Sequence, residues 1–209
     1  KYEEAIESFK QAIRIDPDLA WAHGNLGSAY GKSGKYKEAI ESYRQVIRIN
    51  PDDAEAHNNL GYTYDELGRY KEAIESYKQV IRIDPDDATA HYNLGNAYGE
   101  LDKYEEAIEA YKQAIKINPD YVAAHYTLTD TYFKSGMNKE AMEANKQLQR
   151  LIRNKPGLAD GFGDAYDEIS KNLIETLKQD IKADPDRAVL HVLLGGAYKI
   201  GGMYKEAME

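Results

Sequence analysis

The sequence contains no cysteine, and this absence removes several kinds of chemistry from consideration. A disulfide framework, a thiol nucleophile, an iron–sulfur cluster and a cysteine-ligated zinc site all require that residue. Zero cysteine does not by itself identify a compartment. The polar composition favours a soluble, cytoplasmic chain, and a targeting signal preceding Lys1 would lie outside this sequence.

Long hydrophobic runs and positive charge are also scarce. No apolar stretch approaches the roughly 18 residues that a membrane-spanning helix needs, and the mean hydropathy is -0.72. The chain has 27 Lys and Arg against 36 Asp and Glu, a net charge of -9, which is the wrong sign for binding a phosphate backbone. We therefore expect neither membrane insertion nor nucleic-acid binding.

Phenylalanine and tryptophan are rare, with three and one against 18 tyrosines, and a repeated motif explains such a ratio most simply. Four prolines, at positions 17, 51, 85 and 119, lie 34 residues apart, each between Asp or Asn and Asp. Other residue types keep the same period: His23, His57, His91 and His125; Leu26, Leu60, Leu94 and Leu128; Tyr30, Tyr64, Tyr98 and Tyr132; Tyr36, Tyr70 and Tyr104; Ala39, Ala73, Ala107 and Ala141; Tyr43, Tyr77 and Tyr111.

Within each period, apolar and small residues recur at helical spacing in two blocks, which predicts two helices per repeat. Gly34, Gly68 and Gly136 fall between the blocks, where a residue of positive φ can end a helix. Asp52 followed by Glu55 has the spacing of a capping box at the next helix start. Small residues at two further positions predict close helix packing: Gly27, Gly61 and Gly95, with Ala39, Ala73 and Ala107.

The segments Ala54–Tyr64 and Tyr70–Tyr77 resemble the tetratricopeptide repeat. This resemblance implies an all-α fold, a right-handed superhelical solenoid of antiparallel helix pairs. One departure is that His occupies the position where the family most often has Trp.

The repeat divides the chain into seven segments of a single solenoid domain. Residues 1–16 match the second helix of a truncated repeat, and residues 17–50, 51–84 and 85–118 are complete repeats. Residues 119–155 form a degenerate repeat with a lengthened second helix, residues 156–184 one with a shortened turn, and residues 185–209 a truncated repeat. The partial pairs at both ends indicate a fragment, for which end-to-end self-association is an alternative role.

We expect residues 137–170 to be the weakest interior segment. Asn138 and Asn145 replace aromatic residues of the repeat there, and Gly161 and Gly163 weaken a following helix by up to about 1 kcal/mol each relative to Ala.

No catalytic, metal or cofactor site is indicated. The five histidines, including His191, lie one or more whole repeats apart, whereas the ligands of a metal must converge within about 2 Å of it. The Asp-Pro-Asp runs lack the spacing of a calcium loop, and the segment 161–166 lacks the third glycine and the preceding strand of a dinucleotide site. We therefore expect a non-enzymatic protein without metal or cofactor.

The residues that packing does not explain lie beside the apolar stripe of the first helices, on the face that lines the concave groove in tetratricopeptide proteins. Tyrosines can anchor a peptide there, and an amide ladder can bind its backbone without reading side chains. The candidate groove residues are Asn25, Asn59, Asn93, Thr127, Tyr62, Tyr92, Tyr126, Asn96 and Glu55. The alternative is that these are ordinary exposed helix residues, since Asn is common at this repeat position.

The charge of this face indicates the kind of partner. Family members that bind the acidic C-termini of chaperones use Lys, Arg and Asn from successive first helices, and the equivalent positions here hold no Lys or Arg. Acidic residues predominate instead: Glu55, Asp65, Glu66, Glu100 and Asp130, partly offset by Lys32 and Lys134. A neutral or basic peptide segment is therefore the expected ligand.

A basic stripe forms a second candidate site. Lys146, Arg150 and Arg153 follow at helical spacing with Lys155 close behind, and no acid occurs from 144 to 159. The stripe is either a docking site or a set of cations stabilising a helix C-terminus by about 0.3–1 kcal/mol each.

Taken together, these patterns predict a protein–protein interaction scaffold that binds an extended peptide in its groove. The alternatives are the non-catalytic, substrate-recruiting part of a larger enzyme such as a glycosyltransferase, and a self-assembly module. The sequence does not name the partner or the process.

Overall fold

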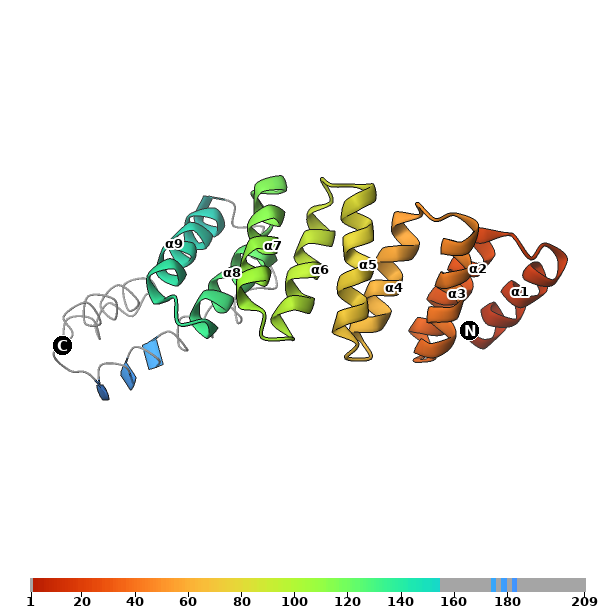
Figure 1. Ribbon diagram of the computed structural model, residues 1–209, viewed down its shortest axis with the longest axis horizontal. Helices are drawn as coiled ribbons and strands as arrows, with labels where there is room; N and C mark the ends of the chain where they lie inside the picture. The colour runs from red at the N-terminus through yellow and green to blue at the C-terminus, as the bar shows by residue number, and fades with distance from the viewer. Residues whose placement is uncertain (1, 155–173, 176–177, 180–181, 184–209) are drawn as a thin grey trace. The chain divides into compact units, whose positions relative to one another are not determined.

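The computed structural model describes residues 2–154, 174–175, 178–179 and 182–183 of the chain, which forms two compact units, Lys1–Lys103 and Tyr104–Glu209. The helices of the first unit are α1 (Tyr2–Ile15), α2 (Ala20–Lys32), α3 (Tyr36–Ile49), α4 (Ala54–Asp65), α5 (Tyr70–Ile83) and α6 (Ala88–Gly99) (Figure 1). Those described in the second unit are α7 (Tyr104–Ile117), α8 (Val122–Lys134) and α9 (Asn138–Asn154). All regular structure in the described residues is helical, which confirms the predicted all-α fold.

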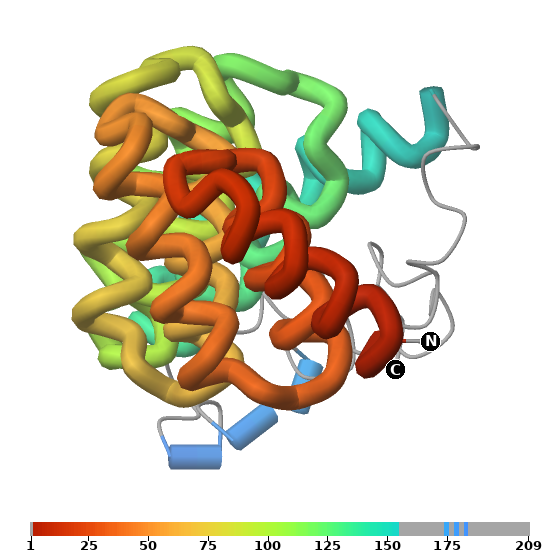
Figure 2. The backbone as a smooth tube through the Cα atoms, turned by 90° about the vertical axis from the view of Figure 1, so that its right-hand side faces the viewer, coloured from red at the N-terminus to blue at the C-terminus, as the bar shows by residue number. Residues whose placement is uncertain are grey.

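The first unit is built in two layers. Its first helices, α2, α4 and α6, lie in one layer, where α2 contacts α4 and α4 contacts α6. Each of them also packs on second helices, α2 between α1 and α3 and α4 between α3 and α5. Figure 2 looks along this unit and shows its helical hairpins stacked one behind another. In the second unit, α8 packs between α7 and α9 in the same way. The predicted solenoid of antiparallel helix pairs is therefore confirmed.

A left-handed residue ends each first helix, as the glycine spacing predicts. Gly34, Gly68 and Gly136 have φ angles of 75°, 67° and 75°. Around the first of them, Gly34 N donates to Gly31 O at 3.0 Å and Lys35 N donates to Tyr30 O at 2.9 Å, the two bonds of a Schellman motif. The third repeat has Asp102 at this position, with φ 56° and the same pair of bonds. A non-glycine residue in this conformation costs about 1–2 kcal/mol, which short polar side chains tolerate best.

The expected capping box of Asp52 and Glu55 is wrong by one residue. The N-cap of α4 is Asp53, whose side chain accepts a hydrogen bond from Ala56 N at 2.8 Å. Because α4 begins at Ala54, Asp52 lies outside the helix and instead pairs with Arg82 at 2.5 Å. Asp87 caps α6 in the same manner, whereas Leu19 and Tyr121, at the N-caps of α2 and α8, provide no side-chain cap.

Three of the four described histidines are buried, as expected, His91 is half-buried, and all four contact the turn at the repeat boundary. His57 Nε2 lies 3.0 Å from the carbonyl oxygen of Pro51, six residues before it. His23, His91 and His125 make the same contact with Pro17, Pro85 and Pro119 at 2.8, 3.1 and 3.0 Å. A carbonyl only accepts, so Nε2 donates its proton in each case. Each first helix is thereby tied to the turn that precedes it.

The small residues are required where first and second helices cross. A Cβ atom on Gly27 would lie 2.7 Å from Tyr43 Cε1, and one on Gly61 would lie 2.7 Å from Tyr77 Cε1. Both distances are well below van der Waals contact, so each glycine admits the tyrosine ring of its own repeat.

The fourth repeat is irregular at the equivalent positions. Thr129 replaces the glycine and Asn145 the tyrosine, and both side chains are fully buried. Neither amide atom of Asn145 has a hydrogen-bond partner among the described residues. The helix that carries it, α9, has 17 residues against 14 in α3 and α5. Of the segment expected to be weakest, residues 155–170 lie outside the described part, as do Gly161, Gly163, His191 and the repeats at 156–184 and 185–209.

Candidate peptide-binding face

The candidate groove residues all lie on first helices. In the first unit, α2 carries Asn25, α4 carries Glu55, Asn59 and Tyr62, and α6 carries Tyr92, Asn93 and Asn96. The contacts of α4 with α2 and α6 bring these residues onto one surface, which we name the first-helix face. Tyr126 and Thr127 lie on α8 in the second unit, half-buried on that helix.

The amide ladder is half-buried, and part of its hydrogen-bonding capacity is used within the helices. Asn25, Asn59 and Asn93 are all of intermediate exposure. Asn25 Nδ2 donates to Trp21 O at 2.8 Å, one helical turn earlier, and Thr127 Oγ1 donates to Ala123 O at 3.0 Å. For Asn25, the side-chain oxygen is then the group best placed to accept a hydrogen bond from a ligand. That these side chains bind a peptide stays a prediction.

Two aromatic side chains are strongly exposed on the first helices of the first unit. Trp21 on α2 is 67% exposed and Tyr62 on α4 is 57% exposed. Trp21 makes an edge-to-face contact with Phe9 of α1, with ring centroids 5.8 Å apart and planes at 79°. The sequence pattern predicts a binding role for Tyr62 but none for Trp21. Two features of the sequence point to Trp21 as a site residue: it is the single tryptophan of the chain, and it lies four residues before Asn25.

Tyrosine hydroxyls bind the carboxylates of the same region. Tyr77 Oη donates to Asp65 Oδ2 at 2.6 Å, and Tyr36 Oη donates to Glu66 Oε2 at 3.1 Å. The second oxygen of Asp65 is buried and has no hydrogen-bond partner among the described residues. Burial raises the pKa of Asp65 to about 6, with a further rise from the nearby charges of Glu100 and Glu66 and an opposing effect of the Tyr77 hydrogen bond. The surface thus holds desolvated negative charge that a cationic ligand group would stabilise.

We expect the pKa of Asp65 to make the chain more stable in mild acid. In the unfolded chain this carboxyl has an ordinary pKa near 3.8, and folding raises it to about 6. The folded state therefore binds more protons between these values, and the stability contributed by Asp65 rises as the pH falls through about 6. The variant Asp65→Asn is neutral at every pH and should be more stable than the native chain at pH 8.

The check is thermal unfolding of both proteins at a series of pH values from 8 to 4, followed by circular dichroism. The stability advantage of Asp65→Asn over the native chain should shrink steadily below pH 6. The matched control Glu55→Gln removes an exposed acid from the same helix and should show no such trend. An advantage of Asp65→Asn that does not change with pH would contradict the assigned pKa.

The basic stripe lies on α9, within the second unit. Lys146, Arg150 and Arg153 are exposed, Arg153 is in the last turn of the helix, and Lys155 lies outside the described residues. Lys146 Nζ lies 3.5 Å from Glu143 Oε2, a weak pair at the surface. The position at the C-terminal end fits the expected stabilisation of the helix dipole as well as it fits a docking site.

The described residues contain no group of three or more His, Asp or Glu side chains that could hold a metal ion. A search of the same residues finds no helix long and apolar enough to cross a membrane.

Comparison with known proteins identifies the family. The model of the TPR repeat matches four overlapping stretches, residues 1–34, 32–68, 64–102 and 95–136. A search of curated proteins finds no match. Among solved structures, a crystal structure of MamA is 27% identical with a TM-score of 0.71, over 75% of this chain and 91% of that chain.

Two further solved structures are similar. MamA 41-end from Desulfovibrio magneticus RS-1 is 26% identical with a TM-score of 0.69, over 74% of this chain and 87% of that one. YrrB, a TPR protein with an unusual peptide-binding site, is 22% identical with a TM-score of 0.62, over 88% and 96% of the two chains, and shows the shared fold. Because the family model covers residues 1–136, the chain belongs to the TPR repeat family, whose members are typically interaction scaffolds.

Proposed function

We propose that the first-helix face of α2, α4 and α6 binds an extended segment of a protein partner, and that the segment is neutral or basic. The observation that carries this proposal is the pairing of exposed aromatic rings with negative charge on one face. Trp21 and Tyr62 offer large, amphipathic surfaces of the kind that anchor peptides. The exposed residues Glu66 and Glu100 offer carboxylates to a Lys or Arg side chain of the ligand.

The amide ladder supports binding to a peptide backbone. Asn25, Asn59 and Asn93 recur once per repeat on successive first helices, so each can exchange hydrogen bonds with a different peptide group of an extended chain. Such contacts give affinity without strict sequence specificity. The charges then select against acidic segments, because a carboxylate of the ligand would meet the carboxylates of the face.

The proposal is tested by selecting binders from a randomised library of nine-residue peptides on the full 209-residue chain. Affinities can be measured through the fluorescence of Trp21, the single tryptophan, which lies at the proposed site. We expect the selected peptides to have zero or positive net charge. Selection of mainly acidic peptides would contradict the charge argument.

For a selected peptide, the triple variant Asn25→Ala, Asn59→Ala and Asn93→Ala should bind at least about tenfold more weakly. Each lost hydrogen bond costs about 0.5–1.5 kcal/mol, and 1.4 kcal/mol corresponds to a tenfold change. Helicity and melting temperature should change little. The matched control is Gln11→Ala, Gln45→Ala and Gln79→Ala, which removes an equivalent row of amides from the second helices. Equal affinity of both triple variants for the peptide would remove the ladder from the mechanism.

A further inference from the structure

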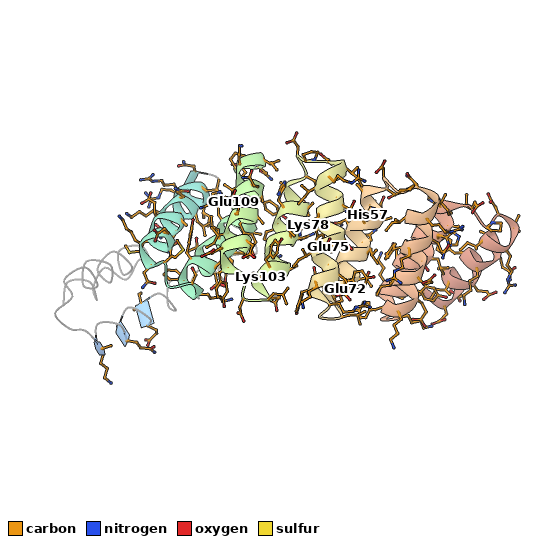
Figure 3. All side chains as sticks on the ribbon, viewed as in Figure 1. His57, Glu72, Glu75, Lys78, Lys103 and Glu109 are labelled. Atoms are coloured by element: carbon orange, nitrogen blue, oxygen red, sulfur yellow. The ribbon has the colours of Figure 1, made fainter. Side chains whose placement is uncertain are left out.

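The opposite side of the repeat, formed by second helices, contains pockets that the proposed function does not use. One pocket of about 430 Å³ lies over α2 between α1 and α3, and another of about 470 Å³ lies over α4 between α3 and α5. A third, of about 290 Å³, lies over α8 between α7 and α9 in the second unit. We name this side of the first unit the second-helix face. Figure 3 labels Glu72, Glu75 and Lys78 along α5 and His57 beside them.

The pockets are equivalent by the 34-residue repeat. The floor of the first is formed by Leu26 and Tyr30, and that of the second by Leu60 and Tyr64. One isoleucine adds to each from the preceding second helix, Ile13 in the first pocket and Ile47 in the second. Each pocket is therefore an apolar depression large enough for one bulky side chain.

The two walls of each pocket carry opposite charge. The wall from the preceding second helix is basic, with Lys10 and Arg14 in the first pocket and Arg44 in the second. The wall from the following second helix is mainly acidic, with Glu38 and Glu41 in the first pocket and Glu72 and Glu75 beside one cation, Lys71, in the second.

The basic groups are directed to the tyrosine of the floor. Lys10 Nζ lies 5.9 Å from the ring centre of Tyr30, and Arg44 Nη2 donates to Tyr64 Oη at 2.9 Å. In the second unit, Lys112 Nζ lies 5.8 Å from the ring centre of Tyr132. Glu41 and Glu75 remain exposed on the other wall, and Glu75 makes only a weak surface pair with Lys78 Nζ at 3.5 Å. Each pocket can thus offer a cation on one side and a carboxylate on the other.

The order of charged walls and pockets along the face determines the order of acidic, apolar and basic residues in a matching ligand. From α1 towards α5 the surface presents base, pocket, acid, base, pocket, acid. The second helices α1, α3 and α5 pack on the first helices between them. Packed helices lie about 8–10 Å apart, so successive pockets are at least about 10 Å apart. An extended chain advances about 3.3 Å per residue, so at least three residues span one repeat. An acidic, an apolar and a basic residue in succession then form the shortest ligand segment that matches one repeat.

We propose that the second-helix face binds an extended protein segment built of acid–apolar–base triplets, with one large apolar side chain in each pocket. The carboxylate of each triplet faces the basic wall, and its cation faces the acidic wall. The site is separate from the first-helix face, so neither proposal depends on the other.

The probe for this proposal is a nine-residue peptide with the triplet Asp-Leu-Lys three times. Titrated into the full chain by isothermal calorimetry, it should bind at least tenfold more tightly than a peptide of the same composition with the three leucines adjacent. The variant Glu41→Lys with Glu75→Lys should weaken binding of the probe at least tenfold. A peptide with the triplet Asp-Leu-Glu should bind this variant more tightly than it binds the native chain, because the charges again match.

The control variant Glu55→Lys reverses a charge on the first-helix face and should leave the tenfold preference for the ordered over the rearranged peptide unchanged. Circular dichroism establishes that each variant retains its helix content. Equal affinities for the ordered and rearranged peptides, or no rescue by the Asp-Leu-Glu peptide, would overturn the proposal. A second copy of the chain is the other possible occupant of this face, and light scattering tests for it. If the chain self-associates and the variant Glu41→Lys with Glu75→Lys does not, the face binds a second copy and the proposal is overturned.

Discussion

Replacing Ala73 by Leu should lower the free energy of unfolding by about 1–3 kcal/mol, the usual cost of overpacking a close-packed interior. Ala73 has no exposed surface, and it lies on α5, which packs against both α4 and α6. The equivalent residues Ala39, Ala107 and Ala141 are equally buried, so the small side chain is a property of the repeat. Leu has three more heavy atoms than Ala, and they cannot be accommodated without shifting a neighbouring helix.

The matched variant is Glu75→Leu, two residues further along α5 on its exposed side. A surface substitution usually changes stability by no more than about 0.5 kcal/mol. Urea denaturation of the two variants, compared with the native chain, checks both expectations. Equal midpoints would contradict the assignment of Ala73 to the helix interface.

Periodicity alone was sufficient to predict the helices, their turns and their packing faces, because each depends on residues close in sequence. The left-handed conformation of Gly34 follows from its place after a helical block, and the burial of Ala73 follows from helical spacing. Asp102 shows the limit of the glycine argument, since the backbone of the repeat imposes a positive φ on a residue that does not prefer it.

The features that the sequence did not reveal depend on groups brought together by folding. The hydrogen bond from Tyr77 to Asp65 joins α5 to the end of α4, and its effect on the carboxyl pKa depends on burial. The charged walls of each pocket come from helices about one repeat apart, such as Lys10 on α1 and Glu41 on α3. A sequence pattern gives the position of each residue in its repeat but not which groups face one another.

In the fourth repeat Thr replaces Gly and Asn replaces Tyr, and the two replacements together change the packing of the helix pair. In the second repeat, the ring of Tyr77 occupies the space beside Gly61, where a Cβ atom would lie 2.7 Å from Cε1. Thr129 fills the equivalent place, and the smaller Asn145 stands where the ring would be. The cost of this solution is a buried amide with no hydrogen-bond partner among the described residues, which is worth about 1–3 kcal/mol.

We therefore expect the double variant Thr129→Gly with Asn145→Tyr to be more stable than the native chain, with a free energy of unfolding at least about 1 kcal/mol higher. The variant restores the glycine–tyrosine pair and removes the unpaired amide. Asn145→Tyr alone should place its ring against Thr129, and Thr129→Gly alone should leave a cavity, so neither single change should give this gain. Urea denaturation of all four proteins gives the coupling between the two positions, and hydrogen exchange of the α8 and α9 amides shows whether the gain is local. The two single variants each change the free energy of unfolding. If the sum of these changes equals that of the double variant within about 0.5 kcal/mol, the two positions do not interact.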